Sequence, residues 1–334
     1  MAVRLVLVGY GYWGPNLARN FSKAKGAELR YIVDLDAKKR ERAAEEYPFI
    51  KVVSSFEEVL PDVDAVIIAT PPKTHHALAK LALEAGKHVL VEKPVTTNVE
   101  DARELAKLAH EKKLTLMVDY TFIYGDSVRY LKTLLDKQEL GTLHAFQFQR
   151  QAIEFLRRDV NVVEDLMTHD VSMLVYWLGE KAAKPRRLTA VGKSHFIKGV
   201  EDEAFAYLDY GDLTVTLMVS SLSPVKLRKV MILGDRKMAE FDDVRVAGKV
   251  EVHEKEIKGP LEAPATYMDF VVQCNPGSTI IPYIKSREPL ANMASHFIDC
   301  IGSGKKPETD ISFGLVVTDL IERINEQVKG SSSA

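Results

Sequence analysis

The stretch Val3-Arg4-Leu5-Val6-Leu7-Val8-Gly9-Tyr10-Gly11-Tyr12-Trp13-Gly14 joins an apolar run to a glycine-rich turn. The apolar half predicts a buried strand, and the second half has the pattern G-x-G-x-x-G that opens a helix after such a strand. Gly9 permits the tight turn, Gly11 lets a pyrophosphate approach the backbone, and Gly14 lets the helix pack on the strand. The pattern predicts a dinucleotide-binding turn, with an ordinary strand-to-helix turn as the alternative. The expected cofactor contacts of this turn come from Gly9, Gly11, Tyr12, Trp13 and Gly14.

An acidic residue follows the next strand-like run at the spacing that such a site requires. Asp34 ends the run 29–34, twenty residues after Gly14. Its carboxylate would accept hydrogen bonds from the adenosine ribose of NAD and would repel the 2′-phosphate of NADP. We therefore expect NAD as the cofactor. The basic stretch 38–40 keeps NADP open as the less favoured alternative.

Composition limits the classes of protein that this chain can belong to. Its 334 residues leave room for two domains, and 46% hydrophobic with 28% charged residues is typical of a soluble globular protein. A net charge of −2 gives no electrostatic basis for binding nucleic acid or an anionic membrane. The two cysteines, Cys274 and Cys300, lack metal-like spacing and indicate a reducing compartment. With no leader-like start and no apolar run of 18 residues, we expect a cytoplasmic protein without a metal.

Short apolar runs alternate with helical segments over the first 120 residues. The strand-like runs are 3–8, 29–34, 64–70, 88–91 and 114–118. This alternation predicts an α/β domain over 1–120, a doubly wound parallel sheet with helices on both faces. Ser55–Glu58 and Thr97–Glu100 each have the S/T-x-x-E pattern of a capping box, which predicts two helix starts.

The order of strand-like and helical segments changes after residue 121. Strand-like runs follow at 143–149, 188–191, 204–210, 213–219 and 229–233, with helices at 126–139 and 165–178. This order predicts an α+β domain over 121–330 with a mostly antiparallel sheet. We expect the C-terminal helices in 289–328 to pack back on the first domain.

Two loops follow predicted strands of the first domain, at the edge where ligands of parallel sheets bind. One carries Thr70, Pro71 and His75, and His75 either lies beside the cofactor or begins a helix. The other is Glu92-Lys93-Pro94, in which Pro94 ends the strand. Lys93 would then lie near the nicotinamide, where burial and the positive ring disfavour its ammonium form. A solvated lysine in a polar turn is the alternative.

Asp165 and His169 fall on one stripe of the predicted helix 165–178, opposite an apolar stripe that includes Val171. A histidine can take a proton at neutral pH, and a carboxylate one turn away can orient it. An exposed surface pair is the alternative. Just before this helix, Arg150, Arg157, Arg158 and Asn161 form either an anion-binding group for a substrate such as a nucleotide sugar or a solvated loop.

Taken together, GYGYWGPN, ATPPKTHH, Glu92-Lys93-Pro94 and Asp165-x-x-x-His169 resemble the Gfo/Idh/MocA oxidoreductases over nearly the whole chain. The resemblance implies an N-terminal Rossmann domain and a C-terminal domain on a large open sheet, whose exposed face forms dimers or tetramers. It also implies that Lys93 contacts the nicotinamide ribose and the substrate, and that Asp165 and His169 are the family's carboxylate and histidine.

Within that family, the segments Tyr12–Asn16 and Asp165–Asp170 are most similar to dehydrogenases that oxidise C3 of a UDP-N-acetylglucosamine-type sugar. We hypothesise that His169 takes the proton of a sugar hydroxyl while hydride passes to NAD, and that Lys93 stabilises the alkoxide. The roles of Lys93 and His169 are interchangeable at this point. The alternatives are a dehydrogenase of a free sugar or inositol, disfavoured by Met167, and a non-catalytic regulator that binds NAD and a sugar.

Overall fold

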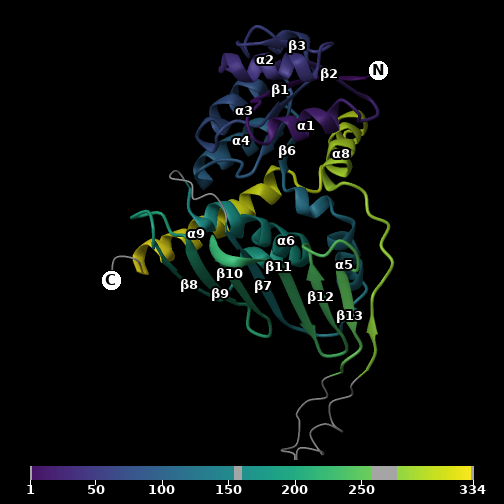
Figure 1. Ribbon diagram of the computed structural model, residues 1–334, viewed down its shortest axis with the longest axis vertical. Coiled ribbons are helices and arrows are strands. Elements are labelled where there is room, and N and C mark those ends of the chain that lie inside the picture. Colours follow the sequence, from purple (N-terminus) through teal and green to yellow (C-terminus); the bar gives the residue numbers. More distant parts are fainter. Residues whose placement is uncertain (1, 154–159, 257–276, 332–334) are drawn as a thin grey trace, which may run out of the picture. The chain divides into compact units, whose positions relative to one another are not determined.

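The computed structural model describes residues 2–153, 160–256 and 277–331 of the chain (Figure 1). Contacts divide the chain into two compact units, each assembled from two stretches of sequence. The first unit comprises Met1–Gly125 and Arg287–Asp319, and the second comprises Asp126–Ser286 and Leu320–Ala334. None of the helices in the described ranges has the length and apolar character that crossing a bilayer requires.

The first unit is built on a six-stranded parallel sheet in the order β3-β2-β1-β4-β5-β6. The strands are β1 (Val3–Val8), β2 (Ala27–Val33), β3 (Lys51–Val53), β4 (Ala65–Ile68), β5 (His88–Glu92) and β6 (Leu116–Asp119). Every residue of β4 and β6 is buried, as expected of strands that helices cover on both faces. The strand order reverses at β1, so the switch point of the sheet lies at the glycine-rich turn after β1.

Helices surround this sheet. They are α1 (Gly14–Phe21), α2 (Ala37–Glu46), α3 (His75–Glu84), α4 (Val99–Glu111), α8 (Pro289–Ser303) and the first part of α9 (Ile311–Ser331). Short 3-10 helices span Leu60–Asp62, Pro72–Thr74 and Thr121–Tyr124. α8 packs against α1 and β1, and the rings of Phe21 and Phe297 meet edge to face at 6.2 Å. Residues from near the end of the chain therefore complete the core of the first unit.

Two predicted helix starts differ from the structure. Ser55 Oγ accepts a hydrogen bond from the Glu58 amide at 3.4 Å, but a turn and a 3-10 helix follow instead of an α-helix. Pro61 explains this, because it supplies no N–H donor to a continuing α-helix. α4 begins one residue later than predicted: its cap is Asn98, whose side chain accepts from the Asp101 amide at 2.8 Å.

The second unit is built on an eight-stranded sheet in the order β14-β13-β12-β11-β7-β10-β9-β8. The strands are β7 (Leu143–Ile153), β8 (Arg187–Lys193), β9 (Glu203–Asp209), β10 (Thr214–Ser220), β11 (Leu222–Gly234), β12 (Met238–Asp242), β13 (Val250–His253) and β14 (Thr279–Ile280). Neighbouring strands are antiparallel except for β7 and β10, which are parallel. The predicted fold class is confirmed in both units.

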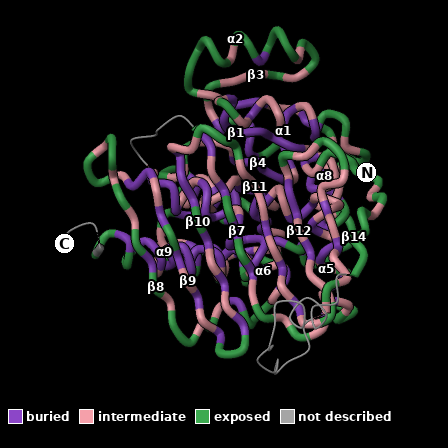
Figure 2. The backbone as a smooth tube through the Cα atoms, turned by 60° about the horizontal axis from the view of Figure 1, so that its bottom comes forward, coloured by how far each residue is buried: buried purple, intermediate pink, exposed green. Residues whose placement is uncertain are grey.

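One face of the second sheet carries the core. Buried and more exposed residues alternate along β7 and β10, and the alternation is visible as purple against pink and green in Figure 2. Phe146 and Phe148 of β7 stack on Trp177 at 5.9 and 6.0 Å. Trp177 belongs to α6 (Thr168–Leu178), which a π-helix, Val163–Met167, precedes. The remaining helices of this unit are α5 (Asp126–Asp136), a 3-10 helix (Gly179–Ala183) and the end of α9.

Candidate active site

The turn after β1 has the backbone that a dinucleotide site needs. Gly9 has a φ of +100°, and a Cβ there would lie 2.5 Å from the Ala69 carbonyl oxygen. A Cβ on Gly14 would collide with the Gly9 carbonyl oxygen, so both positions require glycine for the fold itself. Gly11 differs, because a Cβ there would meet nothing within 4 Å. Its glycine therefore leaves open space beside the backbone, where a ligand can approach.

The start of α1 offers donors beside that space. Trp13 is the N-cap residue and its side chain makes no capping hydrogen bond, while Tyr12 is 94% exposed. Free N–H groups and the helix dipole at such a start favour phosphate oxygens. The turn therefore fits the pyrophosphate of a dinucleotide.

Asp34 stands at the end of β2 and holds the turn. Its Oδ2 accepts from the Tyr10 amide at 2.7 Å and its Oδ1 accepts from the Asp36 amide at 2.9 Å. An ionised carboxylate has further lone pairs, so these two bonds still leave capacity for ribose hydroxyls. Arg40 donates to the carbonyl oxygens of Asp34 and Leu35 at 2.9 and 2.8 Å, which directs its guanidinium to the backbone.

His75 begins α3, and its ring is fully buried. Its Nδ1 lies 2.7 Å from the Pro94 carbonyl oxygen and its Nε2 lies 2.8 Å from the Thr70 carbonyl oxygen. Burial lowers the pKa of His75, while the two carbonyl contacts raise it. His75 thus begins a helix, as one of the two alternatives predicted, and its buried ring links the loop after β4 to the loop after β5, while its contact with the cofactor stays a prediction. Thr70 and Pro71 remain at the surface of that loop.

Lys93 follows β5 and is partly exposed. Its amide donates to Glu92 Oε2 at 3.2 Å, and its charge lowers the pKa of both Glu92 and Asp119. Asp119 is 1% exposed, and sequence reasoning did not select it. The signal that would have found it is the pairing of β5 with β6, which sets Glu92 beside Asp119 in register. The structure thus gathers one ammonium and two carboxyl groups at the carboxyl edge of the parallel sheet.

Asp165 and His169 lie on consecutive turns where the π-helix passes into α6, and both are partly exposed. The amide of Asp165 donates to the Asn161 carbonyl oxygen at 3.0 Å. Ser172, on the next turn of α6, is fully buried and donates to the His169 carbonyl oxygen at 2.7 Å. Most residues of α6 are buried, so the partly exposed His169 is its accessible base, and Asp165 precedes it on the π-helix.

The predicted anion-binding group is largely structural where it is described. Arg150 is 4% exposed and directs Nε and Nη2 at Asp170 Oδ1, at 3.0 and 2.7 Å. The side chain of Asn161 donates to Glu201 and accepts from the amide groups that begin the π-helix. Internal partners engage both buried groups, and their contact with a substrate stays a prediction. Arg157 and Arg158 lie outside the described residues.

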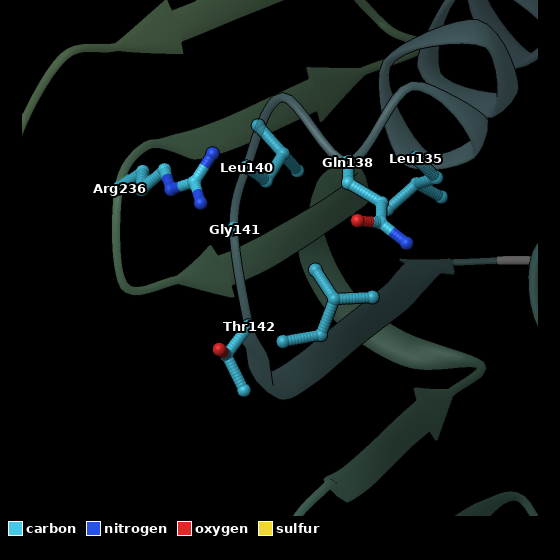
Figure 3. A pocket seen from close by; sticks show the side chains of 7 residues that line it. Leu135, Gln138, Leu140, Gly141, Thr142 and Arg236 are labelled. Atoms are coloured by element: carbon cyan, nitrogen blue, oxygen red, sulfur yellow. The ribbon is translucent and has the colours of Figure 1, made fainter.

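The structure also brings together groups that no sequence motif indicated. His76, Asp101 and Glu104 lie close enough for a metal, because α3 and α4 pack together. Glu104 already contacts Lys80 at 2.6 Å and His76 at 2.8 Å, which satisfies this cluster without an ion. A depression of about 410 Å³ lies between α5, β7 and the β11–β12 turn (Figure 3). Leu135, Leu140 and Arg236 line it, and it contains none of the predicted site residues.

Comparisons with known proteins agree with these observations. Residues 3–120 match the model of an oxidoreductase family with an NAD-binding Rossmann fold, named GFO_IDH_MocA. Residues 128–240 match the GFO/IDH/MocA C-terminal domain.

Individual relatives cover much of the chain. UDP-N-acetylglucosamine 3-dehydrogenase of Acidithiobacillus ferrooxidans is 30% identical over 72% of this chain and 74% of its own length. Inositol 2-dehydrogenase 2 of Mycolicibacterium vanbaalenii is 30% identical over 62% of both. A solved structure of the A. ferrooxidans enzyme has a TM-score of 0.84 at 24% identity and covers 99% of each chain, which shows the shared fold. The family resemblance and the oxidoreductase class are thereby confirmed: the chain belongs to the Gfo/Idh/MocA oxidoreductases, with an NAD-binding Rossmann fold in residues 3–120.

Proposed function

We propose that the protein is an NAD-dependent dehydrogenase that removes hydride from C3 of a UDP-N-acetylglucosamine-type nucleotide sugar. One observation carries the proposal: Lys93, Asp165 and His169 are all present in a chain whose 30% identical relative is named for that reaction. A relative named as an inositol dehydrogenase is equally identical over a smaller share of the chain. A dehydrogenase of inositol or a free sugar is therefore the second candidate.

The proposed chemistry uses residues from both units. NAD, when bound, supplies the hydride acceptor. His169 takes the proton of the reacting hydroxyl, and Lys93 donates a hydrogen bond to the developing alkoxide. Asp165, one turn before His169, orients the imidazole. The reverse assignment, with Lys93 as the proton acceptor, uses the same groups. Either assignment requires the two units to present Lys93 and His169 to one substrate.

Asp34 supports NAD over NADP. Its carboxylate would stand against the 2′-phosphate of NADP. Of the nearby basic residues, Arg40 donates to two backbone carbonyl oxygens, and Lys39 Nζ lies 4.0 Å from Asp34 Oδ2. Titrating each cofactor into the protein should give a lower Kd for NAD than for NADP. Equal Kd values would contradict this preference.

A spectrophotometric screen of NAD reduction tests the function. UDP-N-acetylglucosamine, free N-acetylglucosamine and myo-inositol are compared under one condition, with His169→Ala beside the wild-type protein. The matched control is His110→Ala, which changes an exposed histidine on α4. We expect turnover with the nucleotide sugar only, lost in His169→Ala and kept in His110→Ala.

The other outcomes of the screen are equally informative. Turnover with myo-inositol alone would favour the second candidate. NAD binding without turnover on any of these substrates would favour a non-catalytic regulator. Replacing Arg157 and Arg158 with alanine sharpens the distinction, because only an anionic substrate should lose affinity.

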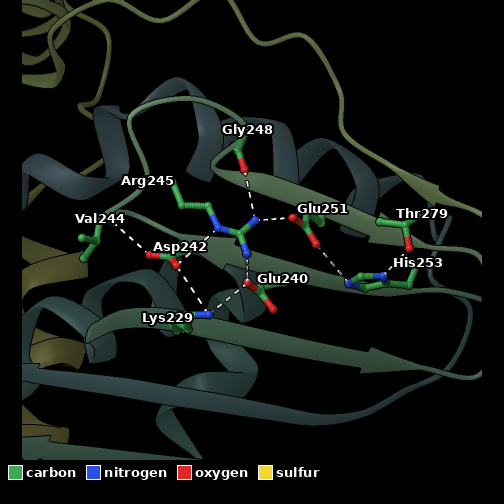
Figure 4. Close-up of polar contacts among 9 residues, drawn as sticks. All are labelled: Lys229, Glu240, Asp242, Val244, Arg245, Gly248, Glu251, His253 and Thr279. Atoms are coloured by element: carbon green, nitrogen blue, oxygen red, sulfur yellow. Dashed lines mark hydrogen bonds and ion pairs between the residues drawn. The ribbon is translucent and has the colours of Figure 1, made fainter. Parts of the chain in front are cut away.

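We also propose that the protein forms homo-oligomers through the open face of the second sheet. Val191, Phe205 and Met218 are neighbours across β8, β9 and β10, and they are 51%, 42% and 37% exposed. On the other half of the same sheet, with β7 and β11 between, Arg245 contacts Glu240, Asp242 and Glu251, as Figure 4 shows. An apolar row on an exposed sheet face is typical of a protein–protein interface. Light scattering should give a mass above 37.4 kDa, and Phe205→Asp should lower it.

A further inference from the structure

Two carboxyl side chains end neighbouring strands at the carboxyl edge of the parallel sheet. β5 pairs with β6 in parallel, and the last matched pair in the register is Glu92 with Asp119. Paired residues on adjacent strands point to the same face of a sheet, so the two side chains lie next to each other. Asp119 is 1% exposed, and the Glu92 Oε1 atom is buried.

One oxygen of each carboxyl group has a hydrogen-bond donor. Asp119 Oδ1 accepts from the Thr121 hydroxyl at 2.7 Å, and Glu92 Oε2 accepts from the Lys93 amide at 3.2 Å. Within the described ranges, the other two oxygens, Glu92 Oε1 and Asp119 Oδ2, are buried without a donor. Two ionised carboxylates can only accept hydrogen bonds, so neither could satisfy the other. A single proton between them would satisfy both.

The electrostatics of the pair point the same way. Burial raises the pKa of both groups, and the neighbouring Asp119 carboxyl raises the pKa of Glu92 further. The Lys93 ammonium lowers the pKa of both, and the nearby Trp13 indole lowers that of Asp119. Like charges in a buried site disfavour double ionisation, whereas the lysine and the indole favour keeping one charge. Together, these effects favour a state in which the two carboxyl groups hold one proton.

We propose that Glu92 and Asp119 hold one proton between them and that the resulting singly charged pair positions Lys93 for hydride transfer. The inference rests on the proposed function for the reaction that Lys93 serves. Glu92 donates the shared proton to Asp119, and the single negative charge matches the ammonium of Lys93. Both acids act through Lys93, which makes them positioning residues.

The arrangement also brings together residues from three places at the carboxyl edge of the sheet. Trp13 comes from the glycine-rich turn, Glu92 from the end of β5 and Asp119 from the end of β6. Fixing the charge of the pair therefore fixes the place of Lys93 relative to the turn that binds the pyrophosphate. This link explains why an acid stands at the end of β6, where a fully buried strand would otherwise favour an apolar residue.

Infrared spectroscopy tests the shared proton without any substrate. The ligand-free wild-type protein is compared at neutral pH with Glu92→Gln and Asp119→Asn, and thermal unfolding verifies that both variants fold. Each amide can donate to the carboxylate that remains, so that carboxylate ionises. We expect a protonated-carboxyl C=O band in the wild type that disappears in both variants. A band that persists in Asp119→Asn would overturn the sharing, because burial alone would then protonate Glu92.

Kinetics on the substrate found by the screen test the positioning role. Each single variant should lower kcat about tenfold, with the KM for NAD changed less than about threefold. The double variant should be no slower than the slower single variant, because the two acids act as one unit. Losses that multiply in the double variant would overturn the role as a pair. If no substrate is found, the proposed function fails while the infrared result still decides whether the proton is shared.

Discussion

The carboxyl edge of the parallel sheet and the core beneath α6 both bury carboxyl groups, but only the first lies where ligands of such sheets bind. At the sheet edge, Glu92 and Asp119 each keep one buried oxygen without a donor among the described residues. Beneath α6, Asp170 Oδ2 also lies buried without a donor among the described residues, but Arg150 directs two N–H groups at Asp170 Oδ1, and Asn161 bonds a neighbouring side chain and two backbone amides. Both regions are rich in charge, so charge alone does not distinguish a site from a scaffold.

The difference lies in where the unused capacity is found, because Asp170 forms an ion pair with Arg150 inside the core while Glu92 and Asp119 lie at the carboxyl edge of the sheet. A buried polar group whose partners are all internal contributes to folding, and leaving it unpaired is costly. A buried polar group with unused capacity at a ligand-binding edge is a candidate for function. On this criterion the edge that holds Lys93 is the stronger candidate, and Arg150 belongs to the scaffold.

Replacing Lys93 with alanine should have the largest effect on activity. Loss of the group that stabilises the alkoxide should lower turnover by about 10²- to 10⁴-fold, while the Kd for NAD stays within a few fold. Lys107→Ala is the matched control, because that lysine is 77% exposed on α4. Turnover near the wild-type level in Lys93→Ala would remove the sheet edge from the chemistry.

Replacing Arg150 with methionine should have the largest effect on stability. The change leaves Asp170 buried without its ion pair, which costs about 3–5 kcal/mol of unfolding free energy. Burial already raises the pKa of Asp170, and removing Arg150 raises it further. The folded state then binds more protons than the unfolded state, so the loss should grow as pH rises above about 4.

Urea unfolding of Arg150→Met at several pH values measures this effect. The double variant Arg150→Met, Asp170→Leu should recover much of the loss, because it removes the stranded charge as well. A single variant as stable as the wild type would show that Arg150 is not part of the scaffold.

Replacing two glycines of the turn after β1 should distinguish an effect on stability from an effect on NAD binding. Gly9→Ala forces a side chain onto a φ of +100° and against the Ala69 carbonyl oxygen, and should cost about 1–3 kcal/mol of stability. Gly11→Ala meets open space, so its melting temperature should match the wild type while its Kd for NAD rises. If Gly11→Ala binds NAD as tightly as the wild type, the pyrophosphate does not lie at this turn.

The smallest effect should come from the ion pair that joins α1 to α8. Arg19 lowers the pKa of Glu288 to about 2, but both side chains are about 40% exposed. Glu288→Gln should therefore cost less than about 1 kcal/mol near neutral pH. A lowered acid pKa stabilises the fold above the unfolded value, so this cost should shrink as pH falls from about 5 toward 2.

Thermal unfolding of Glu288→Gln across that pH range gives the comparison. Glu111→Gln is the control, because that glutamate has a distant partner at 3.9 Å. A cost that does not change with pH would mean that the ion pair does not account for the shift.

The first unit was the more predictable from sequence, for a physical reason. Its strands are short apolar runs separated by residues that favour turns. Each of these patterns spans only a few residues, so it can be recognised in the local sequence. Asp119 was missed because its position beside Glu92 depends on the register between β5 and β6, and no local sequence pattern contains that register. The capping box at Ser55 failed for a local reason that was visible, since Pro61 follows it.

The second unit was less predictable, because its elements depend on distant partners. β12, β13 and β14 are short, and they were not recognised before pairing defined them. The π-helix before α6 also went unforeseen. Arg150 was assigned to a loop, yet it alternates with Phe146 and Phe148 along β7, and that period of two would have placed it inside.

The route of the chain has a consequence for building new proteins from this one. Residues 287–319 return to the first unit, and α9 begins in that unit and ends in the other. A gene cut after residue 125 would lack α8 and leave Phe21 without its aromatic neighbour Phe297. Swapping the nucleotide-binding half between family members therefore requires three crossovers in each gene: after residue 125, before residue 287 and after residue 319.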